Sequence, residues 1–307
     1  MISLSPMQAL GIPVALIGSV FLAAGSEFQQ HGVSQVNAGT TPNSRAGLGV
    51  RQLIALARRP SWLIGTLMLG LAVVLQLFSL YLAPLTVVQP LGAAALIITA
   101  LITARVTKTK LGRPAIRAIA FCVGGIGLFV TVAALTTTTI PITNTQLVIV
   151  LVILGAVLLI FGLAFALLRK RFTRIIYVVG AGVLFGFVAT LAKVLITRIQ
   201  TILEGGLHLT PADALTVVCL IGLAAAGILG SYFVQTAYSS GSPGVVVAGL
   251  TVIDPLIGVT IGIVVLGEAA GAPPWASIVF VIAGLLAIYG VIQLSREQPQ
   301  TTQPNVA

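Results

Sequence analysis

The chain has 307 residues, of which 58% are hydrophobic and only 7% are charged, and its mean hydropathy is +1.13. Water-soluble globular proteins do not reach this composition, so the sequence predicts an all-α polytopic membrane protein. The formal net charge of +10 would suit a nucleic-acid-binding protein, but the basic residues lie in short segments between apolar stretches. This is the positive-inside pattern of membrane proteins, and nucleic acid is therefore not an expected partner.

The apolar stretches predict nine transmembrane helices in one domain over residues 1–296, although the length would also accommodate ten. In chain order the expected spans are residues 7–32, 62–83, 85–105, 116–135, 147–168, 175–196, 214–238, 244–268 and 275–294. Residues 1–6 lack the basic cluster of a cleavable signal peptide, so the first span is expected to be retained. The tail 297–307 is rich in Gln, Pro and Thr and is predicted to be disordered.

The distribution of basic residues predicts the orientation of the chain. All 16 lysines and arginines except Lys193 and Arg198 fall in segments that alternate to one side of the predicted spans. We therefore expect the N-terminus outside and the C-terminus inside, in a multi-pass protein of the plasma (inner) membrane. Lys193 lies within a span and is expected to extend its ammonium group to the outer headgroups.

The first predicted span ends in a polar stretch. Glu27 and His31 are four residues apart and share one face of the helix. Glu27 could lie in the headgroup layer or line the inner part of a cavity. The segment 34–60 that follows is polar and rich in arginine, and the sequence leaves open whether it contains an interfacial helix or a degenerate span.

The span 244–268 contains an Asp-Pro step near its middle. A carboxylate at the depth of Asp254 costs at least ~2.5 kcal/mol. Pro255 removes one helical hydrogen bond and disfavours helical geometry at the residue before it, so a helix break is expected there. Such a break is tolerated in a membrane only where protein or a water-filled cavity satisfies the polar groups. A charge and a break at one depth therefore predict a substrate site.

A related feature occurs earlier in the chain. Residues 87–91, VVQPL, are similar to residues 252–256, VIDPL, so Gln89 and Pro90 correspond to the Asp-Pro step. Two such features in corresponding halves are typical of a secondary transporter built from inverted repeats.

The internal similarity extends to the preceding spans. Gln76 lies eight residues before Pro84, and Gln235 lies eight residues before Pro243. We accordingly predict one repeat over about residues 7–135, a second over about 175–294, and a central helix at about 147–168 between them. The candidate substrate-binding residues are Asp254, Gln89, Gln76, Gln235 and Glu27, and the candidate helix breaks are Pro90 and Pro255.

Two segments carry a resemblance to a known family. Residues 72–111, AVVLQLFSLYLAPLTVVQPLGAAALIITALITARVTKTKL, resemble the Gln-Pro-Leu-Gly segment of the NIPA-type family. That family belongs to the drug/metabolite transporter superfamily, which also holds the EamA-type permeases. Residues 234–268, VQTAYSSGSPGVVVAGLTVIDPLIGVTIGIVVLGE, are similar to the matching segment there, including the final Gly-Glu. The chain departs from many relatives at residues 106–110, VTKTK, where an acidic Gly-Glu-Arg or Lys-Glu-Arg step is common.

The resemblance covers most of the chain and implies a secondary transporter. In ten-helix EamA-type members each repeat has five helices; this chain is expected to lack the second helix of each repeat and to have gained the central one. Some NIPA-type proteins are described as magnesium transporters, which implies magnesium or another cation as the substrate. The acidic and amide side chains named above could supply oxygen ligands to a largely hydrated ion.

Other functions stay open on the residues alone. An exporter of a small metabolite, drug or lipid-linked molecule would need only an apolar cavity with a few polar groups. A non-transporting membrane accessory subunit would use the Asp-Pro step for packing. The sequence contains no nucleotide-binding loop and no catalytic constellation, so we expect neither an enzyme nor a cofactor. The expected partners are a small-molecule or ion substrate and the lipid bilayer, and a homodimer stays open.

Overall fold

The computed structural model describes residues 6–37, 58–106, 112–168, 174–204, 214–239 and 243–297. Within these ranges all regular structure is helical, and nine helical spans are long and apolar enough to cross a membrane. The prediction of an all-α polytopic membrane protein with about nine spans is confirmed. Most of the ambiguous segment 34–60 and all but the first residue of the tail 297–307 lie outside the described residues.

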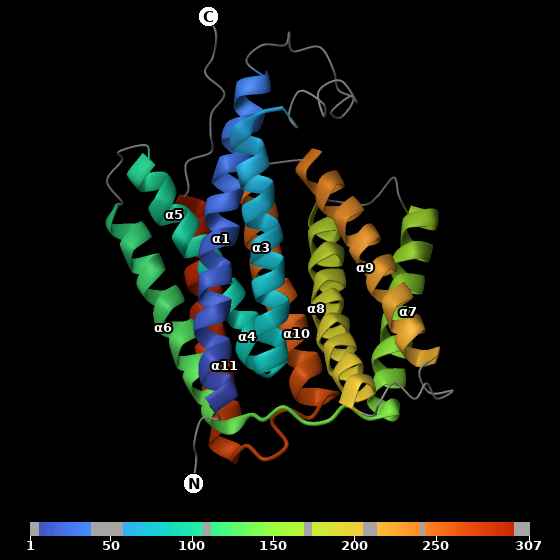
Figure 1. The fold of residues 1–307 in the computed structure, drawn as a ribbon. Coiled ribbons are helices and arrows are strands. Elements are labelled where there is room, and N and C mark those ends of the chain that lie inside the picture. The colour runs from blue at the N-terminus through green and yellow to red at the C-terminus, as the bar shows by residue number, and fades with distance from the viewer. Residues whose placement is uncertain are drawn as a thin grey trace, which may run out of the picture.

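The helices follow one another along the chain (Figure 1). Their bounds are α1 (Pro6–Asn37), α3 (Pro60–Leu82), α4 (Leu85–Gly92), α5 (Ala94–Val106), α6 (Arg113–Thr136), α7 (Asn144–Leu168), α8 (Arg174–Glu204), α9 (Ala214–Ser239), α10 (Pro243–Val264) and α11 (Pro274–Glu297). Helices α4 and α5 together make one span, Leu85–Arg105. The start of α1 and the end of α11 lie at opposite ends of the bundle.

Several helices begin at a proline, where the missing amide hydrogen costs nothing. Pro60, Pro243 and Pro274 are the first residues of α3, α10 and α11. Proline at this position is already fixed near the helical φ, which explains why these three boundaries lie within two residues of the expected ones.

Burial separates the inner helices from the peripheral ones. Within the most apolar stretch of each span, 61% of residues are buried in Leu85–Arg105 and 56% in Ile175–Gln200, against 17% in Asn144–Ala164. Helices α4, α5 and α8 therefore form the interior, and α7 is the most exposed. Large apolar side chains such as Leu67 (78% exposed) and Ile228 (73% exposed) cover the outer surface, as expected for helices that contact lipid.

The helix expected at 147–168 lies between the two predicted repeats in the sequence and corresponds to α7. Helix α7 packs against α9 and α8 and lies at one edge of the bundle, opposite α6 (Figure 1). For reference, we call residues 6–136 the first half and residues 174–297 the second half. The arrangement of these halves as inverted repeats stays a prediction.

The two halves meet chiefly through three helix pairs, α6 with α11, α4 with α10 and α3 with α8. The α6–α11 crossing is close because small residues line it. A Cβ added at Gly125 would lie 2.4 Å from the Ala287 amide nitrogen, and one at Gly290 would lie 2.5 Å from the Cys122 amide nitrogen. Such contacts between backbones are how membrane helices replace the hydrophobic driving force that water supplies elsewhere.

Candidate functional site

The contact between α4 and α10 brings the predicted Gln89 and Asp254 to one place. Gln89 lies against Gly258 of α10, where an added Cβ would be 2.7 Å from Gln89 Nε2 and 2.9 Å from its Cγ. Asp254 and Gly258 are four residues apart and therefore share a face of α10. The amide of Gln89 thus lies about one helical turn from Asp254 along α10.

Helix α8 packs against another side of α10 at the same level. A Cβ at Gly182 would lie 2.6 Å from Ile253 Cβ, and one at Gly186 would lie 2.7 Å from Ile257 Cβ. A Cβ at Gly186 would also lie 3.0 Å from the Asp254 carbonyl oxygen. This pair of glycines four residues apart lets α8 approach α10 closely at the level of the carboxylate.

Both polar side chains at this contact have a buried atom without a hydrogen-bond partner. These atoms are Gln89 Nε2 and Asp254 Oδ1. Gln89 as a whole is 4% exposed. A buried polar group that lacks a partner costs about 1–3 kcal/mol, and a charged group costs more. One unpaired donor and one unpaired acceptor, on two helices from different halves, therefore form the strongest candidate for a binding site.

The two predicted prolines line one cavity. Pro90 and Pro255 face a space of about 90 Å³ between α4, α6, α10 and α11. This volume is enough for about three water molecules. Thr251 also lines the space, and its carbonyl oxygen has no helical donor because Pro255 lacks an amide hydrogen. The two Pro-containing segments are therefore brought together, although they are 165 residues apart in number.

The expected helix break at Pro255 is not present. Helix α10 runs continuously from Pro243 to Val264 with Pro255 inside it. A single proline removes one hydrogen bond, and a helix held on several sides by neighbours can continue past it. In the first half Pro90 also lies inside a helix, α4, and the interruption comes three residues later at Ala93, between α4 and α5.

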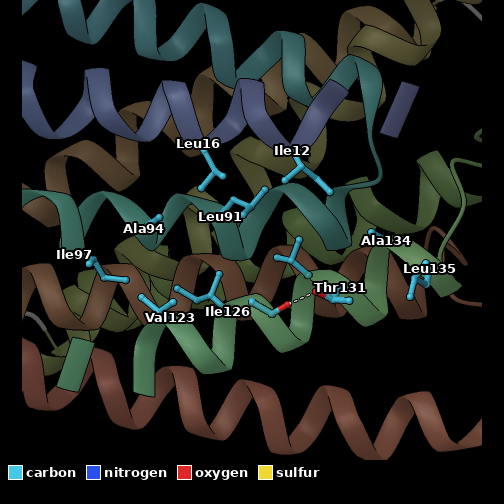
Figure 2. Close-up of a pocket in the computed structure, with 12 residues that line it drawn as sticks. Ile12, Leu16, Leu91, Ala94, Ile97, Val123, Ile126, Thr131, Ala134 and Leu135 are labelled. Atoms are coloured by element: carbon cyan, nitrogen blue, oxygen red, sulfur yellow. Dashed lines mark hydrogen bonds between the residues drawn. The ribbon is translucent and has the colours of Figure 1, made fainter. Parts of the chain in front are cut away.

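A second, larger cavity adjoins the first. It has a volume of about 450 Å³ and is lined by residues of α1, α4, α5 and α6, and Ile126 borders both cavities. Figure 2 shows Ile12 and Leu16 of α1 across from Thr131 of α6. The Thr131 hydroxyl donates to the Gly127 carbonyl oxygen at 2.7 Å, so the lining presents an almost wholly apolar surface.

The other predicted site residues lie elsewhere or cannot be placed. Glu27 accepts a hydrogen bond of 2.5 Å from the Thr103 hydroxyl. Thr103 is 14 residues beyond Gln89, about 20 Å along the α4–α5 span, so Glu27 is not part of the α4–α10 contact at Gln89. Gln76 is half-buried on α3 near Gly18. The side chain of Gln235 lies outside the described residues.

Lys193 does not extend to the headgroups as expected. It is 2% exposed, and its ammonium group donates to the Leu80 carbonyl oxygen and, at 2.9 Å, to the Ala83 carbonyl oxygen. The residue therefore stays inside the bundle and binds the end of α3. The signal in the sequence was a lysine within an apolar span, which most often has a partner in the protein.

Glu268 does not close a helix, as the expected span 244–268 implied. Helix α10 ends at Val264, and the chain then turns at Gly267, whose φ of +72° is a conformation that glycine adopts at low cost. Glu268 is 3% exposed, and its carboxylate accepts hydrogen bonds of 2.7 Å from the amides of Leu85 and Thr86. No pattern in the sequence predicts that Glu268 reaches the first half.

Comparisons with known proteins were made at the level of families, sequences and structures. No protein-family model, no curated protein and no solved structure matches the chain. Among the described residues, no three His, Cys, Asp or Glu side chains gather as a metal site would require. The chain is a multi-pass membrane protein.

Proposed function

We propose that the protein is a secondary transporter for small organic molecules that have an apolar body and a positively charged or hydrogen-bonding group. The observation that carries this proposal is the pair of unpaired atoms, Gln89 Nε2 and Asp254 Oδ1, buried at the α4–α10 contact. Unsatisfied buried groups destabilise a fold, and completion by a ligand is one reason for a protein to keep them.

The chemistry of the pair favours an organic substrate. Asp254 offers an acceptor to an ammonium or amide group, and Gln89 offers a donor to a carbonyl or hydroxyl group. A magnesium ion would need several oxygen ligands around it. The apolar linings of the two nearby cavities suit the rest of an organic molecule.

The position of the pair supports transport rather than simple binding. Gln89 belongs to the first half and Asp254 to the second, so a relative movement of the halves would open or close the contact between them. The resemblance to NIPA-type and EamA-type proteins supports the same function, with magnesium as the substrate that it implies. As part of this proposal, we place the protein in the plasma (inner) membrane and assign it no enzymatic activity.

Flux into proteoliposomes tests the proposal. Purified protein would be reconstituted, and uptake of a fluorescent organic cation such as ethidium would be measured beside Mg²⁺ uptake with an entrapped indicator. We expect ethidium flux that is lost in Asp254→Asn, which keeps the size of the side chain and removes its charge. Thr260→Val is the matched control, because Thr260 lies on α10 and its exposed hydroxyl donates within the helix to Leu256.

Each result has a distinct meaning. Mg²⁺ flux that depends on Asp254, without ethidium flux, would mean that the substrate is a metal cation and not an organic molecule. No flux of either probe above protein-free liposomes, across a panel of organic cations, would favour the non-transporting accessory subunit. Normal flux in Asp254→Asn would remove Asp254 from the site.

A further inference from the structure

The junction between α3 and α4, residues 80–86, leaves backbone groups on both sides without helical partners. Pro84 has no amide hydrogen, so the Leu80 carbonyl oxygen lacks its usual donor four residues later. The Val87 amide donates to the Pro84 carbonyl oxygen at 3.1 Å, so the Ala83 carbonyl oxygen also lacks its usual donor. The amides of Leu85 and Thr86 lie in the first turn of α4, where helical acceptors are absent.

Two buried charges of the second half satisfy these groups. Lys193 of α8 binds the carbonyl oxygens of Leu80 and Ala83. Glu268, from the turn between α10 and α11, binds the amides of Leu85 and Thr86 and accepts a further hydrogen bond of 2.5 Å from the Thr86 hydroxyl. A cation thus lies at the negative end of α3 and an anion at the positive end of α4, which is the favourable sense for both helix dipoles.

The carboxylate of Glu268 is held in place by the residues around it. Gly262 makes room for the carboxylate, because a Cβ there would lie 2.9 Å from Glu268 Oε2 and from Thr86 Oγ1. The backbone of Glu268 is fixed as well, since its amide donates to the Gly262 carbonyl oxygen and its carbonyl oxygen accepts from the Thr138 amide, both at 3.0 Å.

We propose that Lys193 and Glu268 form a gate that holds one end of the bundle closed and must release the α3–α4 junction for that end to open. This end is the one at which α1 begins (Figure 1). The inference rests on the proposed transport function and assigns Lys193 and Glu268 as positioning residues. The halves cannot part here while five hydrogen bonds from two second-half charges remain on a first-half junction.

These hydrogen bonds are suited to a gate because they are polar contacts between charged side chains and backbone groups. When the end opens, water can hydrate the ammonium, the carboxylate and the four backbone groups, so much of the energy lost on separation is regained. A contact between two apolar surfaces would have no such replacement in water. While the end is closed, the same groups are shielded and the bonds are strong.

The test measures the width of this end directly by pulsed electron spin resonance. Spin labels would be placed on cysteines introduced at Met7 on α1, which is 50% exposed, and at exposed Ala270 in the turn before α11. The native Cys122 and Cys219 are fully buried and can stay. In purified protein we expect Glu268→Gln and Lys193→Met to raise the ratio of long to short distances on the order of tenfold, the effect of losing one charge-assisted hydrogen bond.

A milder pair of variants keeps the gate testable if Glu268→Gln or Lys193→Met does not fold. Thr86→Val keeps the shape and removes one bond to Glu268, and a smaller shift in the same direction is expected. Thr131→Val is its control, because the Thr131 hydroxyl donates within α6 to the Gly127 carbonyl oxygen, and no shift is expected. Unchanged distances in all folded junction variants would overturn the gate, as would an equal shift in Thr131→Val.

The distance measurement needs no substrate, so it separates the two proposals. A shift in distances together with no flux of any probe would support the gate as a conformational device and would count against the transport function. Flux that depends on Asp254 together with unchanged distances would keep the transport function and reject the gate.

Discussion

Lys193 and Glu268 bind opposite sides of a single turn of chain. The ammonium of Lys193 lies 2.9 Å from the Ala83 carbonyl oxygen, and the carboxylate of Glu268 lies 2.7 Å from the Leu85 amide nitrogen, with only Pro84 between these two partners. Both charges come from the second half of the chain, and both partners come from the first. The junction between α3 and α4 therefore depends on residues more than 100 positions away.

Gly262 should be sensitive to the smallest possible enlargement. In Gly262→Ala the new Cβ would lie 2.9 Å from both Glu268 Oε2 and Thr86 Oγ1, and the carboxylate would have to move away from α4. We expect a loss of about 1–3 kcal/mol in the free energy of unfolding, measured by denaturant titration in detergent. Gly284→Ala is the control, because nothing lies within 4 Å of its Cβ position. Equal stability of the two variants would show that the carboxylate can be displaced freely.

The neighbouring glycines of α6 should respond in opposite ways. Gly125→Ala would place a Cβ 2.4 Å from the Ala287 amide nitrogen, whereas the Gly124 position has nothing within 4 Å. We expect Gly125→Ala to separate α6 from α11 and lower the thermal unfolding temperature, because backbone atoms cannot rotate away as a side chain can. Gly124→Ala should leave that temperature unchanged or raise it slightly, by reducing the freedom of the unfolded chain. A lower temperature in both variants would mean that the close approach to Ala287 at Gly125 is not what sets the effect.

Replacing Gln89 should separate stability from activity. Gln89→Leu removes a buried amide whose Nε2 has no partner, so the free energy of unfolding should stay the same or rise by about 1–2 kcal/mol. Transport in proteoliposomes should fall at the same time, because the substrate loses a hydrogen-bond donor.

Gln8→Leu is the comparison for this variant. Gln8 is also buried, but its Nε2 donates to the Thr137 carbonyl oxygen at 3.1 Å, and its loss should lower the free energy of unfolding by about 1 kcal/mol. If Gln89→Leu is destabilised as much as Gln8→Leu, the Gln89 amide has a structural role, and the candidate site loses its donor.

The orientation of the chain can be tested with reporter fusions. The asymmetry of basic residues predicts that a fusion after Phe172 reports the cytoplasm and that one after Thr138 reports the exterior. Phosphatase and fluorescent-protein reporters read the two sides independently. A cytoplasmic signal from Thr138 would reverse the orientation and would place the α3–α4 junction on the inner side.

The sequence by itself determined the class of the protein, the number of spans and most helix starts. These properties depend on local composition, because about 20 apolar residues fill the thickness of a bilayer whatever surrounds them. Proline at the first position of α3, α10 and α11 marked those boundaries for the same local reason. The similarity of VVQPL and VIDPL is visible in the sequence, and in the structure Pro90 and Pro255 line one cavity.

The tertiary structure alone decided which polar groups found partners. Asp254 and Lys193 are both single charges within apolar spans, yet Lys193 binds two carbonyl oxygens and Asp254 Oδ1 has no partner. Glu268 looked like the end of a span and is instead a ligand of α4. The cost of burying a charge can be read from one position in a sequence, but the bonds that offset it depend on which helices pack together.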